Sequence, residues 1–157
     1  MPSRALCRVL FVDDDEDAVE MLNLLLKPHE IQVTYARSAS EASLMLKAEC
    51  FDLYLLDAWM PQIDGFEFCR QLRDVDAITP ILFYTGAAYD TDKQKGVAAG
   101  ASAYVIKPDV EGLIETIVDL LAKARANDVA PYWAHEPRLP GENGPSDHLF
   151  SVAELRH

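Results

Sequence analysis

The sequence is poor in cysteine and in basic residues, and it has no long apolar run. Its three cysteines are odd in number and far apart, so neither a disulfide framework nor a Cys–His zinc site is expected, and a reducing, cytoplasmic location fits. The 14 lysines and arginines stand against 26 acidic residues, and the net charge of −12 argues against direct binding of nucleic acid. No apolar stretch is long enough for a signal peptide or for insertion into a membrane.

What the sequence does contain is an ordinary globular composition. It has 157 residues, of which 50% are apolar and 25% charged, so one domain with a substantial core is expected. No P-loop and no dinucleotide-binding glycine pattern is present, which removes two large classes of nucleotide-binding protein.

Short apolar runs rich in β-branched and aromatic residues recur along the chain. Four are apolar on both faces, which is typical of central strands in a parallel sheet covered by helices on both sides: residues 9–12, 53–56, 81–84 and 103–106. A fifth run, residues 31–35, alternates apolar and polar residues and is expected nearer an edge of the sheet.

Segments with helical periodicity separate these runs. Their expected caps are Ser38 with Glu41 as a capping box, Asp64, Thr91 with Gln94, and Asp109, and Gly100 is an expected stop. The apolar faces expected to pack on the sheet are Ala18, Met21, Leu22 and Leu25; Ala42, Met45 and Leu46; Phe66, Cys69 and Leu72; and Leu113, Ile117, Leu120 and Leu121. Five strand–helix repeats ending near Lys123 predict an α/β fold, a doubly wound parallel (βα)5 sheet of flavodoxin-like order 2-1-3-4-5.

Residues 124–157 differ from the predicted domain at residues 1–123. They hold four of the nine prolines, and five acidic residues against three arginines leave a net charge of −2. The segment is too short and too rich in proline for an ordinary output domain, so we expect a domain without a DNA-binding partner domain. Tyr132 and Trp133, and the apolar group within residues 149–155, are expected to dock either on the domain or on a partner.

Polar and charged residues follow four of the predicted strands. Asp13 and Asp14 come after the first, Asp57 after the third, Thr85 ends the fourth and Lys107 follows the fifth. Because functional groups gather beyond the carboxyl ends of the strands in a doubly wound sheet, we expect these side chains to share one cleft. Singly, each has an ordinary explanation as a helix cap, a strand end or a surface lysine, but all four strand ends together favour a functional site.

The chemistry of such a cleft is coherent. Crowded carboxylates need a cation, and Mg²⁺ accepts a few carboxylates while it keeps several waters. An ionised aspartate beside that ion can attack phosphorus to give an aspartyl phosphate. An ammonium group and a hydroxyl then stabilise the transferring phosphoryl group by charge and by position. Residues 15–17, by contrast, suit the start of a helix, where the dipole favours negative charge.

Four motifs, FVDD, LYLLDAWMPQIDGFEF, ILFYTGAA and GASAYVIKP, occur in this order. Over about residues 7–123 the chain resembles the receiver domain of two-component response regulators. The resemblance implies that Asp57 is the phosphoacceptor and that Mg²⁺ is held by Asp13, Asp14, Asp57 and the backbone carbonyl of Trp59. It also implies that Lys107 contacts the phosphoryl group.

The same resemblance implies a switch. Thr85 matches the hydroxyl that moves toward the phosphoryl group, and Tyr104 matches the aromatic residue that turns inward with it. The family also implies a cis peptide before Pro108 and a glycine at position 65. The expected function is transfer of a phosphoryl group from a histidine kinase or phosphotransfer protein to Asp57, catalysed by the domain itself. The fourth helix, fifth strand and fifth helix would then bind a downstream protein target or a second copy of the chain.

Three positions depart from the commonest family pattern. Trp59 stands where smaller polar residues are frequent, and Ala87 has no polar group that would orient an attacking water. We therefore expect slow hydrolysis of the aspartyl phosphate. Asp109 stands where an aromatic residue often follows Lys-Pro, and capping of the next helix explains it.

Other interpretations remain open. A receiver-like interaction module that never takes phosphate is the main alternative, although such chains typically lack one of the site residues. A haloacid-dehalogenase-like phosphatase would use Asp13 and Asp15 as its D-x-D pair, but this leaves Asp57 unexplained. A calcium loop from Asp13 fails because Ala18 takes the glycine position and Leu24 the place of the final acid.

Overall fold

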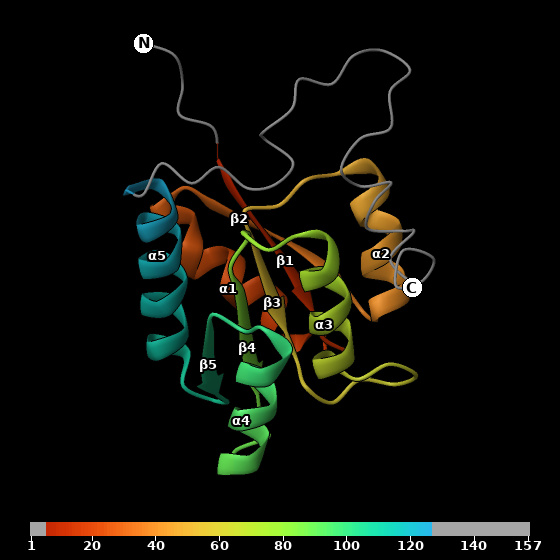
Figure 1. Cartoon of the computed structure of the whole chain (residues 1–157). Coiled ribbons are helices and arrows are strands. Elements are labelled where there is room, and N and C mark those ends of the chain that lie inside the picture. The colour runs from red at the N-terminus through yellow and green to blue at the C-terminus, as the bar shows by residue number, and fades with distance from the viewer. Residues whose placement is uncertain (1–5, 127–157) are drawn as a thin grey trace.

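Five parallel strands form one sheet in the order β2-β1-β3-β4-β5 (Figure 1). The structure is a computed structural model and describes residues 6–126. The strands are β1 (Cys7–Val12), β2 (Ile31–Ala36), β3 (Leu53–Leu56), β4 (Ile81–Thr85) and β5 (Ala103–Ile106). The predicted fold class and strand order are confirmed. The run at residues 103–106, expected among the central strands, is instead the edge strand β5, and only Val105 of its four residues is buried. The expected contacts of Tyr132, Trp133 and residues 149–155 lie outside the described residues.

Helices cover both faces of this sheet. They are α1 (Asp17–Leu26) with a 3-10 turn η1 (Lys27–His29), α2 (Ala39–Ala48), α3 (Gly65–Val75), α4 (Asp90–Ala99) and α5 (Val110–Ala126). Because successive residues of a strand point to opposite faces, each strand feeds two cores. Leu10, Tyr54 and Phe83 pack with α2, α3 and the end of α4, whereas Phe11, Leu55 and Leu82 pack with α1 and α5.

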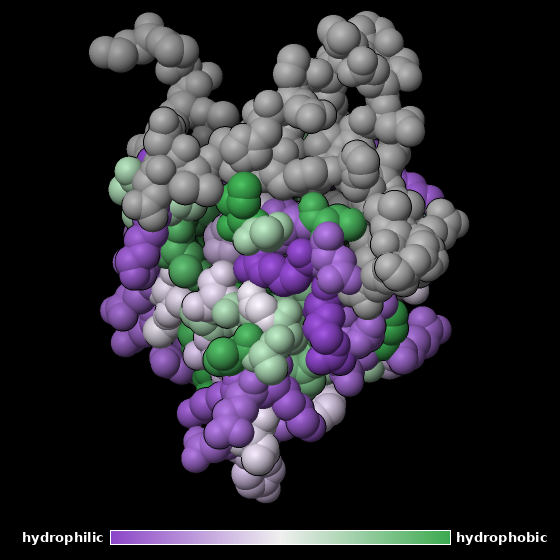
Figure 2. Space-filling model, viewed as in Figure 1, coloured by the Kyte–Doolittle hydropathy of each residue, from purple (hydrophilic) through white to green (hydrophobic). Residues whose placement is uncertain are grey.

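Figure 2 shows the side of the molecule on which α3 and α4 lie. In the described part of this face, apolar residues are scattered among hydrophilic ones. Among residues 6–126, no helix is long and apolar enough to cross a membrane.

Most of the predicted helix ends are confirmed. Ser38 and Asp64 cap α2 and α3, each accepting a hydrogen bond from the backbone N–H three residues on, and Asp109 does the same for Gly112. Gly100 ends α4 in the left-handed conformation, with φ of 106°.

The predicted caps of α4 were wrong. The helix begins at Asp90 with Tyr89 as its N-cap, and the Asp92 carboxylate accepts a hydrogen bond from the Tyr89 N–H at 3.2 Å. Thr91 and Gln94 therefore lie inside the helix. An aspartate at the third helical position supplies the cap, two residues before the predicted Gln94.

The predicted inner face of α1 was also partly wrong. Leu22 and Leu26 are fully buried, whereas Met21 and Leu25 are 38% and 43% exposed. The buried stripe repeats every four residues, so Met21 and Leu25 lie at its border. Other bounds moved as well: β1 starts before residue 9, β2 and β4 each end one residue after their predicted apolar runs, and α5 continues past Lys123 to Ala126.

Candidate functional site

The register of the central strands brings the first two carboxylates together. Val12 pairs with Leu56 across β1 and β3, so the next residues, Asp13 and Asp57, leave the sheet side by side. The Asp57 N–H donates to the Val12 carbonyl at 2.9 Å, which carries the ladder one residue past the strand. The positions of both carboxylates are thus consequences of the strand pairing.

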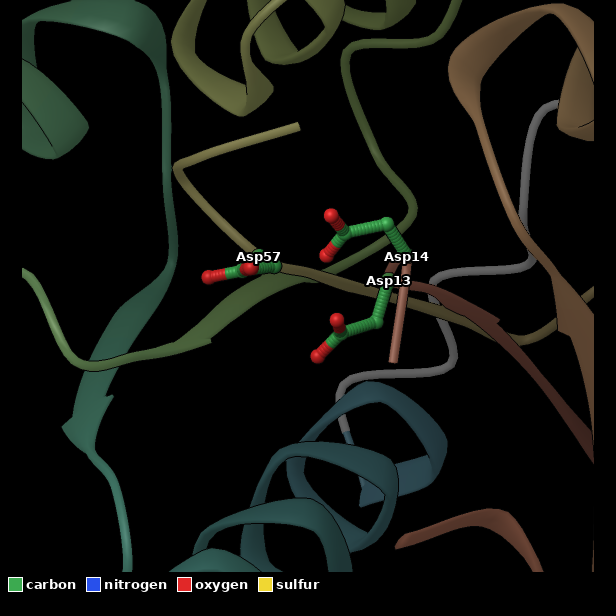
Figure 3. Close-up of side chains that lie close together, drawn as sticks. All are labelled: Asp13, Asp14 and Asp57. Carbon is green, nitrogen blue, oxygen red and sulfur yellow. The ribbon is translucent and has the colours of Figure 1, made fainter. Parts of the chain in front are cut away.

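Three carboxylates converge at this edge of the sheet (Figure 3). Oxygen atoms of Asp13, Asp14 and Asp57 all lie within 4.8 Å of one another. Asp13 is 1% exposed and Asp57 7%, whereas Asp14 is exposed. So close a group of carboxylates repels itself unless a cation lies nearby.

Lys107 provides part of the compensating charge. Its ammonium Nζ lies 2.6 Å from Asp13 Oδ2 and 4.0 Å from Asp57 Oδ2. Burial lowers the pKa of Lys107, but the hydrogen bond to Asp13 and the charge of Asp57 outweigh burial, so the pKa is raised. One ammonium among three carboxylates leaves the cluster with an excess of negative charge.

Burial acts on Asp13 in the opposite sense. Loss of hydration raises the pKa of the Asp13 carboxyl, and its hydrogen bonds to Lys107 and to the Asp15 N–H offset this only in part. Tyr35, which the sequence prediction treated only as a strand residue, fixes the same residue from β2. Its hydroxyl donates to the Asp13 carbonyl at 2.6 Å. No local sequence signal marks this contact.

The two predicted switch residues meet at one residue, Ala87. Thr85, which is fully buried, accepts a hydrogen bond at Oγ1 from the Ala87 N–H at 3.3 Å. The Tyr104 hydroxyl donates to the Ala87 carbonyl at 2.6 Å. Both backbone groups of Ala87 are therefore held, one by each switch residue. Burial and the charges of Asp92 and Asp57 raise the pKa of Tyr104 to about 12, so its phenol stays protonated and able to donate.

The loop after Asp57 is fixed by the first turn of α3. The Gly65 N–H donates to the Ala58 carbonyl at 2.8 Å, and a Cβ at Gly65 would lie 2.0 Å from the Asp57 carbonyl oxygen. Only glycine fits this approach. The Trp59 indole, 52% exposed, stands edge-on to Phe66 with ring centroids 5.9 Å apart. The expected cis peptide between Lys107 and Pro108 is present.

The sequence-predicted site residues are therefore brought to one edge of the sheet. Asp13, Asp14, Asp57 and Lys107 are in direct proximity, and Thr85 and Tyr104 lie together at Ala87. The set of donors is all oxygen, which fits Mg²⁺ better than a softer metal. A cavity of about 310 Å³, lined by Cys7, His29 and Arg125 among apolar residues, contains none of these groups.

Comparison with known proteins agrees with this geometry. The family model described as response regulator receiver domain matches residues 9–118. Response regulator MprA of Mycobacterium leprae is 36% identical over 124 residues, which cover 78% of this chain and 54% of that protein. The alkaline phosphatase synthesis transcriptional regulatory protein PhoP of Bacillus subtilis is 37% identical over 101 residues, covering 64% of this chain and 42% of that protein. The chain thus spans about half the length of these relatives.

Solved structures show the same fold. A CheY-like response regulator receiver domain protein from Methanospirillum hungatei aligns with a TM-score of 0.71 and 28% identity, covering 78% of this chain and 98% of that one. The chemotaxis protein CheY4 of Vibrio cholerae aligns with a TM-score of 0.64 and 31% identity, covering 76% and 98%.

Proposed function

The chain belongs to the response regulator receiver domains of two-component signalling, and on that premise we propose that Asp57 accepts a phosphoryl group from a histidine kinase or phosphotransfer protein. The observation that carries the proposal is the convergence of Asp13, Asp14 and Asp57 within 4.8 Å beside Lys107. A buried carboxylate with spare oxygen atoms next to an ammonium group is both a nucleophile and a cation ligand.

The chain's own residues fit Mg²⁺. Asp13, Asp14 and Asp57 would hold the ion together with the backbone carbonyl of Trp59, because hard oxygen donors at this edge outnumber the cations. When bound, Mg²⁺ supplies positive charge for the transferring phosphoryl oxygens and screens the repulsion between the carboxylates. Lys107 remains hydrogen-bonded to Asp13, which keeps its ammonium aimed at the cluster.

In the proposed step, an Asp57 carboxylate oxygen attacks phosphorus and forms an O–P bond. The P–N bond of the donor phosphohistidine breaks, and its electron pair returns to the imidazole nitrogen, which takes a proton from solvent. Lys107, 4.0 Å from the Asp57 carboxylate, then pairs with a phosphoryl oxygen. The Thr85 hydroxyl contacts another once it leaves the Ala87 N–H.

The expected change at the binding surface follows from the hydrogen bond that Ala87 loses. If Thr85 turns toward the phosphoryl group, one of the two hydrogen bonds that hold the backbone of Ala87 is broken, and the bond from the Tyr104 hydroxyl must adjust. The populations of two conformations of the face formed by α4, β5 and α5 then shift. This face would bind a downstream protein or a second copy of the chain.

The direct test is the intact mass of the protein after incubation with acetyl phosphate and Mg²⁺. One added phosphoryl group is expected on the wild type, and none after chelation with EDTA or in Asp57→Asn. No adduct on a folded wild type would favour the receiver-like module that never takes phosphate. An adduct that persists in Asp57→Asn but is lost in Asp13→Asn would favour the phosphatase alternative.

We further propose that the aspartyl phosphate is hydrolysed slowly. The Ala87 side chain is a methyl group, so it offers no polar group to orient an attacking water. Ala87→Glu should shorten the lifetime of the adduct severalfold, measured as loss of the added mass after the donor is removed. Rapid loss from the wild type, unchanged in Ala87→Glu and in Trp59→Asn, would contradict the proposal.

A further inference from the structure

Four aromatic rings run in contact from the loop after Asp57 to β5. Trp59 meets Phe66 at 5.9 Å with an interplanar angle of 87°, Phe66 meets Phe83 at 5.2 Å and 33°, and Phe83 meets Tyr104 at 5.6 Å and 26°. Each separation lies in the range of attractive ring pairs. We name these four residues the aromatic column; its rings come from the β3–α3 loop, α3, β4 and β5 (elements in Figure 1).

The middle of the column is rigid and its ends have room. Phe66 is 3% exposed and Phe83 is fully buried, so neither ring moves without displacing packed neighbours. Trp59, by contrast, is 52% exposed, and Tyr104 is partly buried. A displacement at one end is therefore passed along the column instead of being absorbed in its middle.

The outer end of the column is tied to the phosphoacceptor loop. Gly65, which precedes Phe66, packs so closely on Asp57 that its α-carbon tolerates no side chain, and its N–H holds the Ala58 carbonyl. Any shift of the backbone at residues 57–59 consequently moves against the first turn of α3. The indole of Trp59 is the side chain of this loop that meets the Phe66 ring.

The inner end of the column is tied to α4. A Cβ at Gly96 would lie 3.0 Å from Tyr104 Cδ2, so the ring rests directly on the helix backbone. The residues of α4 that are buried are Asp92, Gly96 and Ala99, with no large apolar side chain among them. A helix held so lightly responds to a small movement of the ring beneath it.

We infer that Trp59 is a positioning residue for Tyr104, and that the loop after Asp57 sets the position of the Tyr104 ring through the aromatic column. This route differs from that of the Thr85 hydroxyl, which is linked to Tyr104 through the backbone of Ala87. Its use in signalling rests on the proposed function, because a metal or phosphoryl group would have to move the loop. The ring-to-ring linkage itself does not depend on it.

The test is ¹⁹F NMR of the full chain labelled with 3-fluorotyrosine, first without metal. The Tyr104 resonance is identified by its loss in Tyr104→Phe. Trp59→Leu keeps an apolar side chain at a half-exposed position but removes the outermost ring. The column predicts that the Tyr104 resonance shifts in Trp59→Leu, although two rings separate the residues and direct ring-current effects are therefore small.

Phe11→Leu is the matched control. Phe11 is as buried as Phe83 and stands edge-on to Tyr35 at 5.9 Å and 63°, outside the column. It should shift the Tyr35 resonance and leave that of Tyr104 in place. A Tyr104 resonance unchanged in Trp59→Leu, or shifted equally by Phe11→Leu, would overturn the inference.

A second arm adds Mg²⁺ alone and measures its affinity by calorimetry in four proteins: wild type, Trp59→Leu, Tyr104→Leu and the double variant. The column predicts that the change in affinity in the double variant differs by at least about twofold from the product of the two single-variant changes. This difference should persist in a Thr85→Val background. Additive changes would overturn the inference. If none of the four proteins, the wild type included, binds Mg²⁺, the proposed function fails. The metal-free ¹⁹F shift alone then decides whether the column exists.

Discussion

A buried aspartate lies at the amino ends of the strands and another at their carboxyl ends, but the protein balances the two negative charges differently. We call these two ends of the sheet the amino edge and the carboxyl edge. At the amino edge, Asp76 is 1% exposed. One carboxylate oxygen accepts from the N–H groups of Ile78 and Thr79 at 3.1 and 3.0 Å, and the other accepts from the Tyr54 hydroxyl at 3.1 Å. At the carboxyl edge, Asp57 is about as buried, yet among residues 6–126 its carboxylate accepts no hydrogen bond, and Lys107 lies 4.0 Å away.

The difference separates a carboxylate that the protein itself satisfies from one whose oxygen atoms remain open. Asp76 has exchanged water for three protein donors, so its negative charge serves to fix the end of α3 and the start of β4. Arg73 adds to this cluster by donating to the carbonyls of Thr79 at 2.6 Å and Gly100 at 2.8 Å. Asp57 is 7% exposed and, among residues 6–126, no group donates a hydrogen bond to its carboxylate, so its oxygen atoms stay open to the proposed cation and phosphoryl group.

The largest expected effect is a loss of stability when the Asp76 carboxylate at the amino edge is removed. Asp76→Ala leaves two N–H groups and the buried Tyr54 hydroxyl without their acceptor, so the free energy of unfolding should fall by about 3 kcal/mol. Urea denaturation measures it. Glu115→Ala, at an exposed position inside α5, is the control and should stay within about 0.5 kcal/mol of wild type. A loss below about 1 kcal/mol in Asp76→Ala would show that this edge is not a structural cluster.

The next largest expected effect is stabilisation by Mg²⁺ at the carboxyl edge. Added Mg²⁺ should stabilise the folded protein by about 2.7 kcal/mol at a concentration one hundred times its dissociation constant. In Asp14→Asn the same concentration should stabilise less, because one ligand has lost its charge. Asp17→Asn, which changes an acid of the same run outside the cluster, should respond to Mg²⁺ like wild type. Equal responses in all three proteins would mean that the ion acts elsewhere or nonspecifically.

The fold was predictable because it depends on local patterns. Apolar runs and capping residues indicated the strands and most helices, and the strand ends at Asp13, Asp57 and Lys107 indicated the site. Membership of the receiver family, predicted from four motifs, is confirmed. Met21 and Thr91 were misplaced because neighbouring residues offered equally good faces and caps, and only packing against the sheet chooses between them.

The tertiary contacts were not predictable from these patterns. Arg73 donates to the Gly100 carbonyl 27 residues away, and Tyr35 reaches the Asp13 carbonyl from the neighbouring strand. The aromatic column joins four separate elements. Such contacts follow from the register of the sheet and the rotamers of packed side chains, neither of which leaves a mark on the local sequence.

The smallest effect concerns Tyr104. Tyr104→Phe removes the hydroxyl bond to Ala87 and should lower stability by about 1 kcal/mol below pH 10. The pKa of Tyr104 is raised to about 12 from the usual 10 of an unfolded tyrosine, so the folded state holds the proton more tightly. Stability due to Tyr104 is therefore lost as pH rises from 10 through 12. Stability measured across this range should fall less steeply in Tyr104→Phe, and parallel curves would contradict a stabilising hydrogen bond from the Tyr104 hydroxyl.

The most direct test of the contrast between the two edges is phosphoryl uptake from acetyl phosphate by wild type, Asp57→Asn and Asp76→Asn, measured side by side by intact mass with and without Mg²⁺. The account predicts one phosphoryl group on wild type and on the folded fraction of Asp76→Asn, and none on Asp57→Asn or on any protein without Mg²⁺. An adduct retained in Asp57→Asn, or one formed equally well without the metal, would contradict it.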